Sequence, residues 1–186
     1  MKITIFLVML ACFAMFTNEV NAIGLEGMGG KIGIVMPEGD ADTNIGLGFI
    51  ADLGVIVPEL NALRGEFSAE YWGDSYDIGY WEWSWSSISF NGTAKYHFPL
   101  GGDISPFAGA GLCIALSRWS SEWKGTIQNQ PYGSKASDND INFGVHLVGG
   151  VDVPLSPNMK LTGEAKFSTA GSDIFQITGG LVFKLK

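Results

Sequence analysis

One pattern runs through almost the whole chain. From residue 24 to the C-terminus, apolar and polar residues alternate with a period of two. This alternation is typical of a β-strand with one apolar and one polar face, and no segment shows the 3.6-residue period of an amphipathic helix. We therefore expect an all-β fold with eight strands. Their predicted ranges are 24–36, 45–57, 62–72, 84–98, 106–118, 141–153, 159–169 and 174–185.

The connections between these strands are of two kinds. Three are short turns that begin with proline, namely 58–61, 99–105 and 154–158. They alternate with other connections, of which 73–83 and 120–140 are the longest. Proline has no N–H to donate to a ladder, which supports placing these segments between strands. Short turns at one end and longer loops at the other are typical of outer-membrane barrels. We expect the proline turns on the periplasmic side and the long connections outside the cell.

The first 22 residues have the features of an export signal. Lys2 precedes an apolar run from Ile3 to Phe16, which is shorter than the roughly 20 residues that a membrane-spanning helix needs. We expect residues 1–22 to be a signal peptide and residues 23–186 to form one barrel domain. Only Cys113 then remains, so no disulfide forms within the chain, and its apolar surroundings favour a buried, unreactive thiol.

The composition distinguishes two kinds of barrel. A soluble up-and-down barrel turns its apolar face inward, whereas a transmembrane barrel turns it outward. Charged residues make up only 16% of the chain, against roughly 25% in soluble domains. The polar faces are rich in glycine, serine and threonine, which suit the narrow interior of an eight-stranded barrel. We therefore expect an eight-stranded antiparallel transmembrane barrel, and the net charge of −8 argues against a nucleic-acid partner.

Aromatic residues gather near the predicted strand ends. The outer group is Trp72, Trp83, Trp85 and Trp119, and the inner group is Tyr96, Phe98, Phe107 and Phe183. Transmembrane barrels carry an aromatic belt at each membrane interface. The two groups predict two such belts.

The segment 95–99, Lys-Tyr-His-Phe-Pro, is followed by Ser-Pro-Phe-Ala-Gly-Ala-Gly-Leu at 105–112. This strand–turn–strand resembles the small OmpA/OmpX-type outer-membrane β-barrels, a porin-like family, and the pattern covers the chain after residue 22. The resemblance implies the outer membrane of a Gram-negative bacterium, contact with its lipid and lipopolysaccharide, insertion by the barrel-assembly machinery, a monomer and no cofactor. One departure concerns assembly, because the family's terminal signal usually ends in an aromatic residue and this chain ends in Lys186.

The alternation places many charged residues on the face predicted to line the lumen. The inward set is Lys31, Asp52, Arg64, Glu66, Glu70, Lys95, His97, His146, Asp152, Lys160, Glu164 and Lys166. With Lys184 included, six lysine and arginine side chains on this face oppose five acidic ones, and an unpaired buried charge costs several kcal/mol. We expect a salt-bridged plug, because eight strands enclose a space that side chains just fill. The alternative is a narrow polar pore, or a proton path that uses the two histidines.

Some barrels of this family modify lipid A with a serine, a histidine and a carboxylate. Here His97 is followed by Phe-Pro and His146 by Leu-Val, so neither shows the His-x-Ser pairing of the deacylases. We expect no enzymatic activity and no catalytic residue. No spacing suggests a transition-metal site. The run from Asp138 to Asp140 offers oxygen ligands for calcium, although its composition favours a solvated acidic loop.

All six tryptophans lie between residues 72 and 123. They form either an extended aromatic girdle, on a strand that continues beyond the bilayer, or a projecting surface that binds a partner. The predicted contact residues are Tyr76, Tyr80, Trp81, Trp83, Trp123 and Tyr132. We expect a structural or surface-binding role, such as adhesion to an unidentified extracellular ligand. A small passive pore is the first alternative, and a lipid-modifying enzyme is the second.

Overall fold

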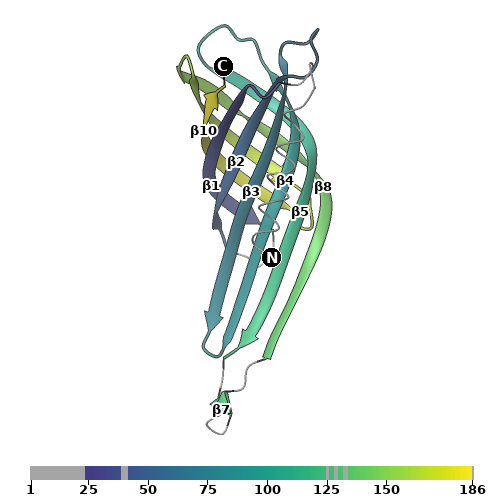
Figure 1. The fold of residues 1–186 in the computed structure, drawn as a ribbon, viewed down its shortest axis with the longest axis vertical. Coiled ribbons are helices and arrows are strands. Elements are labelled where there is room, and N and C mark those ends of the chain that lie inside the picture. Colours follow the sequence, from purple (N-terminus) through teal and green to yellow (C-terminus); the bar gives the residue numbers. More distant parts are fainter. Residues whose placement is uncertain (1–23, 39–41, 125, 128–129, 132–133, 186) are drawn as a thin grey trace.

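Eight long antiparallel strands close into a single barrel in a computed structural model of the chain (Figure 1). The structure describes residues 24–38, 42–124, 126–127, 130–131 and 134–185, so the predicted signal peptide lies outside the described residues. The barrel strands are β1 (Gly27–Pro37), β2 (Asn44–Val55), β3 (Leu63–Ile78), β4 (Trp81–His97), β5 (Ser105–Trp123), β8 (Ser134–Ser156), β9 (Met159–Ser168) and β10 (Ile174–Lys184). Between β5 and β8, the short strands β6 (Thr126–Ile127) and β7 (Gln130–Pro131) pair with each other.

Strands that follow one another in the sequence are neighbours around the barrel. The last strand, β10, returns to the first and pairs with it from Gly27↔Lys184 to Pro37↔Ile174. Each predicted strand corresponds to one barrel strand, and this confirms the predicted fold class. Closure gives every barrel strand a neighbour on both sides, which a hydrogen-bonded sheet in hydrocarbon requires.

The barrel is apolar outside and charged inside. Outward-facing Ile45, Leu112 and Phe143 are 70%, 71% and 75% exposed. Inward-facing Lys31 and Glu164 are each only 5% exposed. This distribution is the reverse of a soluble barrel and matches a chain whose outer surface faces lipid. The expected sidedness is confirmed.

Glycines on the inward face make room for larger side chains. A Cβ atom at Gly111 would lie 2.6 Å from Cε1 of the His146 ring and 2.0 Å from the carbonyl oxygen of Gly92. No side chain fits at that position without moving the backbone. Gly111 therefore reflects how tightly this part of the lumen is packed.

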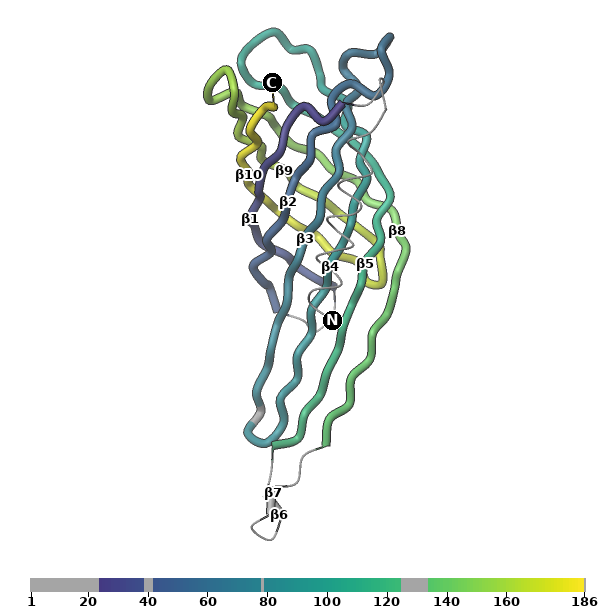
Figure 2. Tube along the Cα trace, in the orientation of Figure 1, coloured from purple at the N-terminus to yellow at the C-terminus, as the bar shows by residue number. Residues whose placement is uncertain are grey.

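Four adjacent strands continue far beyond the other four (Figure 2). β3 runs to Ile78 and β4 starts at Trp81, and β5 and β8 pair as far as Trp123↔Ser134. The predictions of loops at 73–83 and 120–140 are therefore wrong for most of their length. We call residues 73–78, 81–87, 117–123 and 134–140 the projecting sheet. Ile78 lies seven residues after Tyr71 on β3, a length of about 23 Å at roughly 3.3 Å per residue.

The projecting sheet has two free edges. Pairing between β2 and β3 ends at Gly46↔Trp72, and pairing between β8 and β9 starts at His146↔Ser168. Beyond these points β3 and β8 each pair with a single neighbour among the described residues. The free part of β8 carries Lys135, Asp138 and Asp140, and charged side chains of this kind protect an edge from pairing with another chain.

The outer aromatic residues do not form the predicted belt. Pairing from β3 through β4 and β5 to β8 shows no register shift, so Trp85 and Trp119 lie on the same side of the sheet as the inward residues below them. Trp72 is 3% exposed and packs with Val35 and Ile174 inside the barrel. The prediction of an outer lipid-facing belt of tryptophans is therefore wrong.

The inner aromatic group fits its prediction except at one position. Tyr96, Phe98 and Phe183 are exposed, and the rings of Tyr96 and Phe98 lie edge to face with centroids 5.3 Å apart. Phe107 instead faces the lumen, where Lys95 Nζ lies 4.5 Å from the centre of its ring. Phe107 is therefore part of the interior and does not contribute to a belt.

Candidate functional site

Six charged side chains from four strands form a continuous series of ion pairs across the lumen. Lys95 Nζ lies 2.6 Å from Glu66 Oε2 and 3.0 Å from Glu164 Oε2. Lys31 Nζ lies 2.5 Å from Glu164 Oε1 and 2.8 Å from Glu70 Oε1. Lys166 also pairs with Glu70. We call this series the central ion chain, and its three lysines and three glutamates cancel in charge.

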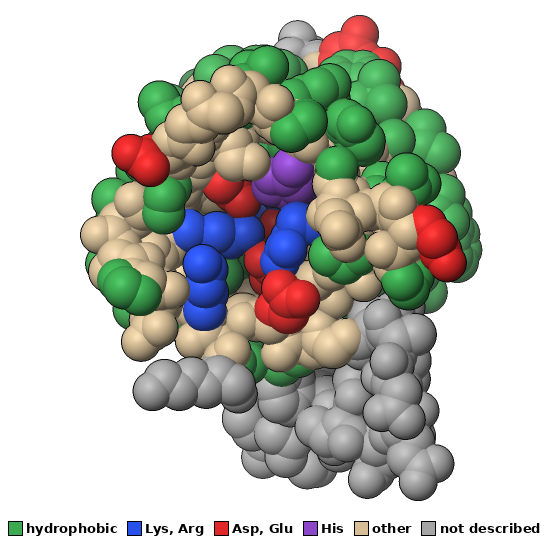
Figure 3. Space-filling view, turned by 90° about the horizontal axis from the view of Figure 1, so that it is seen from above, with side chains coloured by type: hydrophobic (Ala, Val, Ile, Leu, Met, Phe, Trp, Pro, Cys, Tyr) green, Lys and Arg blue, Asp and Glu red, His purple; other side chains and the backbone are tan. Residues whose placement is uncertain are grey.

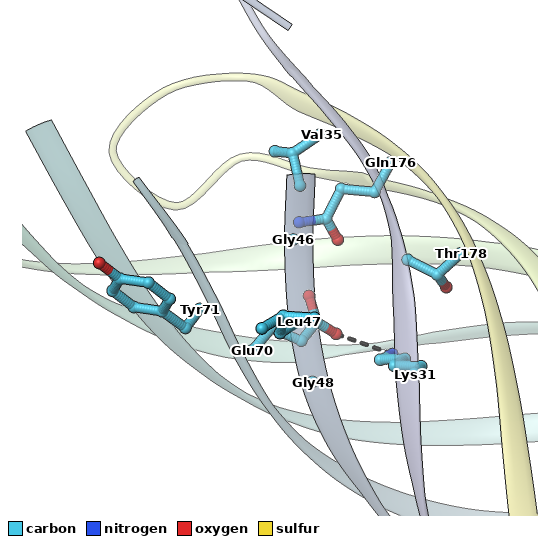
Figure 4. A pocket seen from close by; sticks show the side chains of 9 residues that line it. All are labelled: Lys31, Val35, Gly46, Leu47, Gly48, Glu70, Tyr71, Gln176 and Thr178. Atoms are coloured by element: carbon cyan, nitrogen blue, oxygen red, sulfur yellow. Dashed lines mark ion pairs between the residues drawn. The ribbon is translucent and has the colours of Figure 1, made fainter. Parts of the chain in front are cut away.

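The strand register and one glycine position the central ion chain. Lys31 on β1 is opposite Gly48 on β2, which in turn is opposite Glu70 on β3. A Cβ atom at Gly48 would lie 3.0 Å from Cγ of Lys31 and 3.1 Å from Cγ of Glu70. Figure 4 shows the ion pair between Lys31 and Glu70 beside Gly48. The missing side chain on β2 lets the lysine and the glutamate meet across it.

A second group of ion pairs lies nearer the proline turns. Lys160 Nζ lies 2.8 Å from Oδ2 of Asp52 and 2.8 Å from Oδ2 of Asp152. Arg64 Nη2 is 3.3 Å from Asp52 Oδ1 and 2.6 Å from Glu26 Oε2. Glu26 is not among the predicted lumenal residues, because the alternation of the predicted strand 24–36 assigns it to the outward face. In the structure it precedes the first residue of β1, where the alternation no longer determines which way a side chain points.

The two histidines have separate partners. Nε2 of His146 is 2.9 Å from the hydroxyl of Thr93, and the residue is 1% exposed. Nδ1 of His97 is 3.0 Å from the hydroxyl of Ser105, next to the β4–β5 turn. Neither histidine forms an ion pair among the described residues. The structure therefore brings ten predicted lumenal residues into ion pairs and places the two histidines in neutral hydrogen bonds.

Little space remains beside the central ion chain. A cavity of about 10 Å³ lies beside Lys31, Glu70 and Gln176, which is about the space of one water molecule. Figure 3 looks along the barrel from the proline-turn end, and charged side chains fill the centre of the ring. Thr162 Oγ1, Gln176 Oε1 and His146 Nδ1 are buried with no hydrogen-bond partner. Within the described part of the chain, the ion pairs thus satisfy the buried charges, while these three neutral polar atoms have no partner.

The projecting sheet has two different sides. On the side that continues the lumen wall lie Tyr76, Trp81, Trp83, Trp85, Trp119 and Trp123. The opposite side carries small and charged residues, including the row Ser75–Ser84–Ser120–Ser137. There, Glu82 accepts a hydrogen bond from Lys124, and this contact raises the pKa of Lys124 above the ordinary value for lysine. The last apolar row on that side is Tyr71–Ile88–Leu116–Ile141, so the surface that faces lipid ends where the projecting sheet begins.

The aromatic rings contact one another along the projecting sheet. Ring centroids are 4.9 Å apart for Trp81 and Trp123, and 5.5 Å apart for Trp83 and Trp119. Tyr80, in the β3–β4 turn, lies 5.7 Å from Trp123. We use the name aromatic face for the following seven residues: Tyr76, Tyr80, Trp81, Trp83, Trp85, Trp119 and Trp123. The remaining predicted contact residue, Tyr132, lies outside the described residues.

A cavity of about 320 Å³ lies at the base of the aromatic face, where the projecting sheet leaves the barrel. It is lined by Trp85, Ser117, Trp119, Asp140 and Asn142 from the sheet, and by Gly171 and Ser172 from the β9–β10 turn. Its volume is within the range of about 300–1,000 Å³ typical of small-molecule sites. This cavity was not predictable from the alternation of single strands, because its walls come from four separate segments.

No helix in the described part of the chain is long and apolar enough to span a membrane. Among the same residues, no group of three or more His, Cys, Asp or Glu residues is placed to hold a metal ion. Asp138, named above as a potential calcium ligand, lies on β8 and accepts a hydrogen bond from the backbone N–H of Asn139 at 2.9 Å.

Comparisons with known proteins agree with this architecture. The family model "Outer membrane protein beta-barrel domain" matches residues 4–182. Neisserial surface protein A has 14% identity and a TM-score of 0.58, over 86% of this chain and 95% of that chain. The attachment invasion locus protein Ail of Yersinia pestis has 10% identity and a TM-score of 0.53, over 86% and 99%. The outer membrane enzyme PagL has 19% identity and a TM-score of 0.50, over 86% and 99%.

None of the curated protein sequences compared with the chain matched it. The protein is an eight-stranded transmembrane β-barrel of the small OmpA/OmpX type. The chain belongs to the outer membrane protein β-barrel domain family, and its place is the outer membrane. The solved structures, all below 25% identity, show that this fold serves proteins with different roles.

Proposed function

We propose that this protein binds a ligand outside the cell through the aromatic face of its projecting sheet, while the closed barrel anchors it in the membrane. The observation that carries the proposal is the side of the sheet on which the tryptophans lie. A membrane girdle faces lipid, but these rings continue the lumen wall beyond the last outward apolar row. Lipid contact therefore does not account for them.

The exposure of the aromatic face supports a binding role. Tyr76 is 58% exposed, Trp81 42% and Trp83 43%. Removing such apolar area from water contributes about 25 cal/mol per Å², and tryptophan and tyrosine dominate the binding energy at protein interfaces. The rings already contact one another, so little side-chain freedom is lost when a ligand binds.

The test compares adhesion of bacteria that display the protein with adhesion of bacteria that display variants. The double variant Trp81→Ala/Trp83→Ala removes two exposed rings, and we expect it to abolish adhesion to cultured epithelial cells. The matched control, Tyr96→Ala/Phe98→Ala, removes two exposed aromatic rings at the proline-turn end. Equal adhesion by all three strains would refute the proposal. A gel shift on boiling verifies that each barrel is folded.

We further propose that the lumen is a plug rather than a pore. The central ion chain and the cavity of only about 10 Å³ beside it support a closed interior. In a planar lipid bilayer, the refolded protein should give no discrete current steps. Regular steps in current would contradict the plug and favour the small passive pore.

We also propose that the protein is a binding protein and not an enzyme. The burial of His146 supports this, because a general base must reach the substrate. His97 and Ser105 form a pair at the proline-turn end, far along the barrel from the outer membrane leaflet. Expression of the protein should leave the mass of lipid A unchanged. A shift by the mass of one acyl chain would establish a lipid-modifying activity instead.

A further inference from the structure

The cavity at the base of the aromatic face combines an apolar wall with free polar groups. Trp85 on β4 and Trp119 on β5 are directly opposite each other and form the apolar part. One step closer to the lumen, Ser117 is opposite Asp140, and Asn142 follows two residues later on β8. Among the described residues, the side chains of Ser117, Asp140 and Asn142 make no hydrogen bond or ion pair with the protein.

The walls of the cavity are held in place by their surroundings. The Trp85 ring lies 5.8 Å from Trp72, which belongs to a buried cluster with Val35 and Ile174. The Trp119 ring lies 5.5 Å from Trp83. On the other wall, Gly171 has φ +83°, and a Cβ atom there would lie 2.6 Å from Nδ2 of Asn142. The site exists before any ligand arrives, which reduces the entropy lost on binding.

The chemistry of these groups selects the ligand. A pyranose ring has an apolar face of C–H groups and an edge of hydroxyl groups. Indole rings pack well against the C–H face. The hydroxyl edge is matched by a carboxylate, which accepts hydrogen bonds, and by an amide, which both donates and accepts them. Asp74 and Asp138 lie in the same row as Trp85 and Trp119. Together with Asp140, they repel sulfated or phosphorylated ligands.

We propose that this cavity binds an uncharged sugar unit of a surface glycan, with Trp85 and Trp119 against the ring and with Asp140 and Asn142 bonded to its hydroxyl groups. This inference rests on the proposed function, because it names the class of ligand for the aromatic face. The sugar comes either from another cell or from lipopolysaccharide of the same membrane, and both present the same chemistry.

The test uses the refolded chain in phospholipid nanodiscs without lipopolysaccharide. The probes are lactose, maltose and N,N′-diacetylchitobiose, titrated up to about 20 mM and followed by tryptophan fluorescence and isothermal calorimetry. At least one of these sugars should saturate. Trp119→Ala and Asp140→Asn should each weaken binding by about tenfold or more, since each leaves part of the sugar unpaired or uncovered. The matched control Asp103→Asn removes an exposed carboxylate at the other end of the barrel and should bind as the parent does.

The inference is overturned if none of the three sugars gives saturable binding. It is also overturned if a sugar binds and neither Trp119→Ala nor Asp140→Asn weakens that binding. Binding of heparin or oligolysine without binding of a neutral sugar also overturns it. Competition with core oligosaccharide released from lipopolysaccharide identifies the source of the glycan, and either source supports the inference. Failure here remains separate from failure of the proposed function. If Trp81→Ala/Trp83→Ala abolishes adhesion while no sugar binds, the aromatic face binds another class of ligand.

Discussion

Replacing Glu164 by glutamine tests how much the central ion chain stabilises the barrel. Within the central ion chain, Glu164 is the carboxylate that pairs with both Lys31 and Lys95, at 2.5 and 3.0 Å. The substitution keeps the shape of the side chain and removes its charge. Each lysine retains a second partner, Glu70 for Lys31 and Glu66 for Lys95. The central ion chain of the variant then holds three cations and two anions.

The expected magnitude follows from two opposing terms. Two unit charges about 4 Å apart attract by about 4 kcal/mol at an effective dielectric constant of about 20, so losing two such pairs removes about 8 kcal/mol. Neutralising the carboxylate also removes its desolvation penalty, which is several kcal/mol for a buried ion. The net loss in the free energy of unfolding should be about 3–5 kcal/mol, in line with removal of one partner from a buried ion pair.

The assay is unfolding in urea from phospholipid vesicles, followed by tryptophan fluorescence and by the gel shift on boiling. The matched control is Glu122→Gln, because Glu122 pairs with Lys135 at 3.5 Å between exposed side chains. Exposed pairs contribute about 0–1 kcal/mol. A double variant, Lys31→Met/Glu164→Gln, restores the balance of charge and should lose less stability than the sum of its single changes. The reasoning is refuted if Glu164→Gln unfolds like Glu122→Gln.

Three other predictions follow from the same packing. Gly111→Ala places a methyl group against His146 and should lower the free energy of unfolding by about 1–3 kcal/mol, whereas Gly92→Ala has no atom within 4 Å of its new methyl group and should unfold like the parent. The Cys113 thiol is 3% exposed, so in the folded barrel it should resist a maleimide reagent that labels the urea-unfolded chain, and equal labelling rates would contradict its inward position. The pair between Lys135 and Glu122 is exposed to solvent, so any coupling between them, measured by a double-mutant cycle, should vanish in about 1 M salt.

The barrel was predictable from sequence because lipid acts on every strand in the same way. Each outward position within the bilayer must be apolar, so residues such as Leu47, Phe143 and Ile177 recur with a period of two. The inward set of charges follows from the same alternation. Glu26 was not predicted, because the alternation within the predicted strand 24–36 assigns it to the outward face, whereas β1 begins only at Gly27.

The outer region was less predictable because lipid no longer constrains it. Beyond the row of Tyr71 the outward side becomes polar and the inward side becomes aromatic, so polarity no longer reveals which residues face out. One signal was present nonetheless. Trp81, Trp83 and Trp85 continue the alternation of Lys95, Thr93 and Asn91, which places them on the inward side once β4 is extended. The cavity with Asp140 and Asn142 depends on the register between strands, which a single sequence does not specify.

The ion pairs across the lumen also constrain the order in which the protein is assembled. Lys31 on β1 meets Glu164 on β9 only when β1 and β10 are joined. Before that seam closes, an open sheet entering hydrocarbon would expose the charged side of its strands to lipid, at a cost of about 2–4 kcal/mol for each lysine or arginine near the midplane. A strand-by-strand entry therefore meets a barrier that grows with every strand added. For entry into lipid without the assembly machinery, this cost favours a chain that curls up and closes as it crosses the membrane surface, so that insertion and closure occur together.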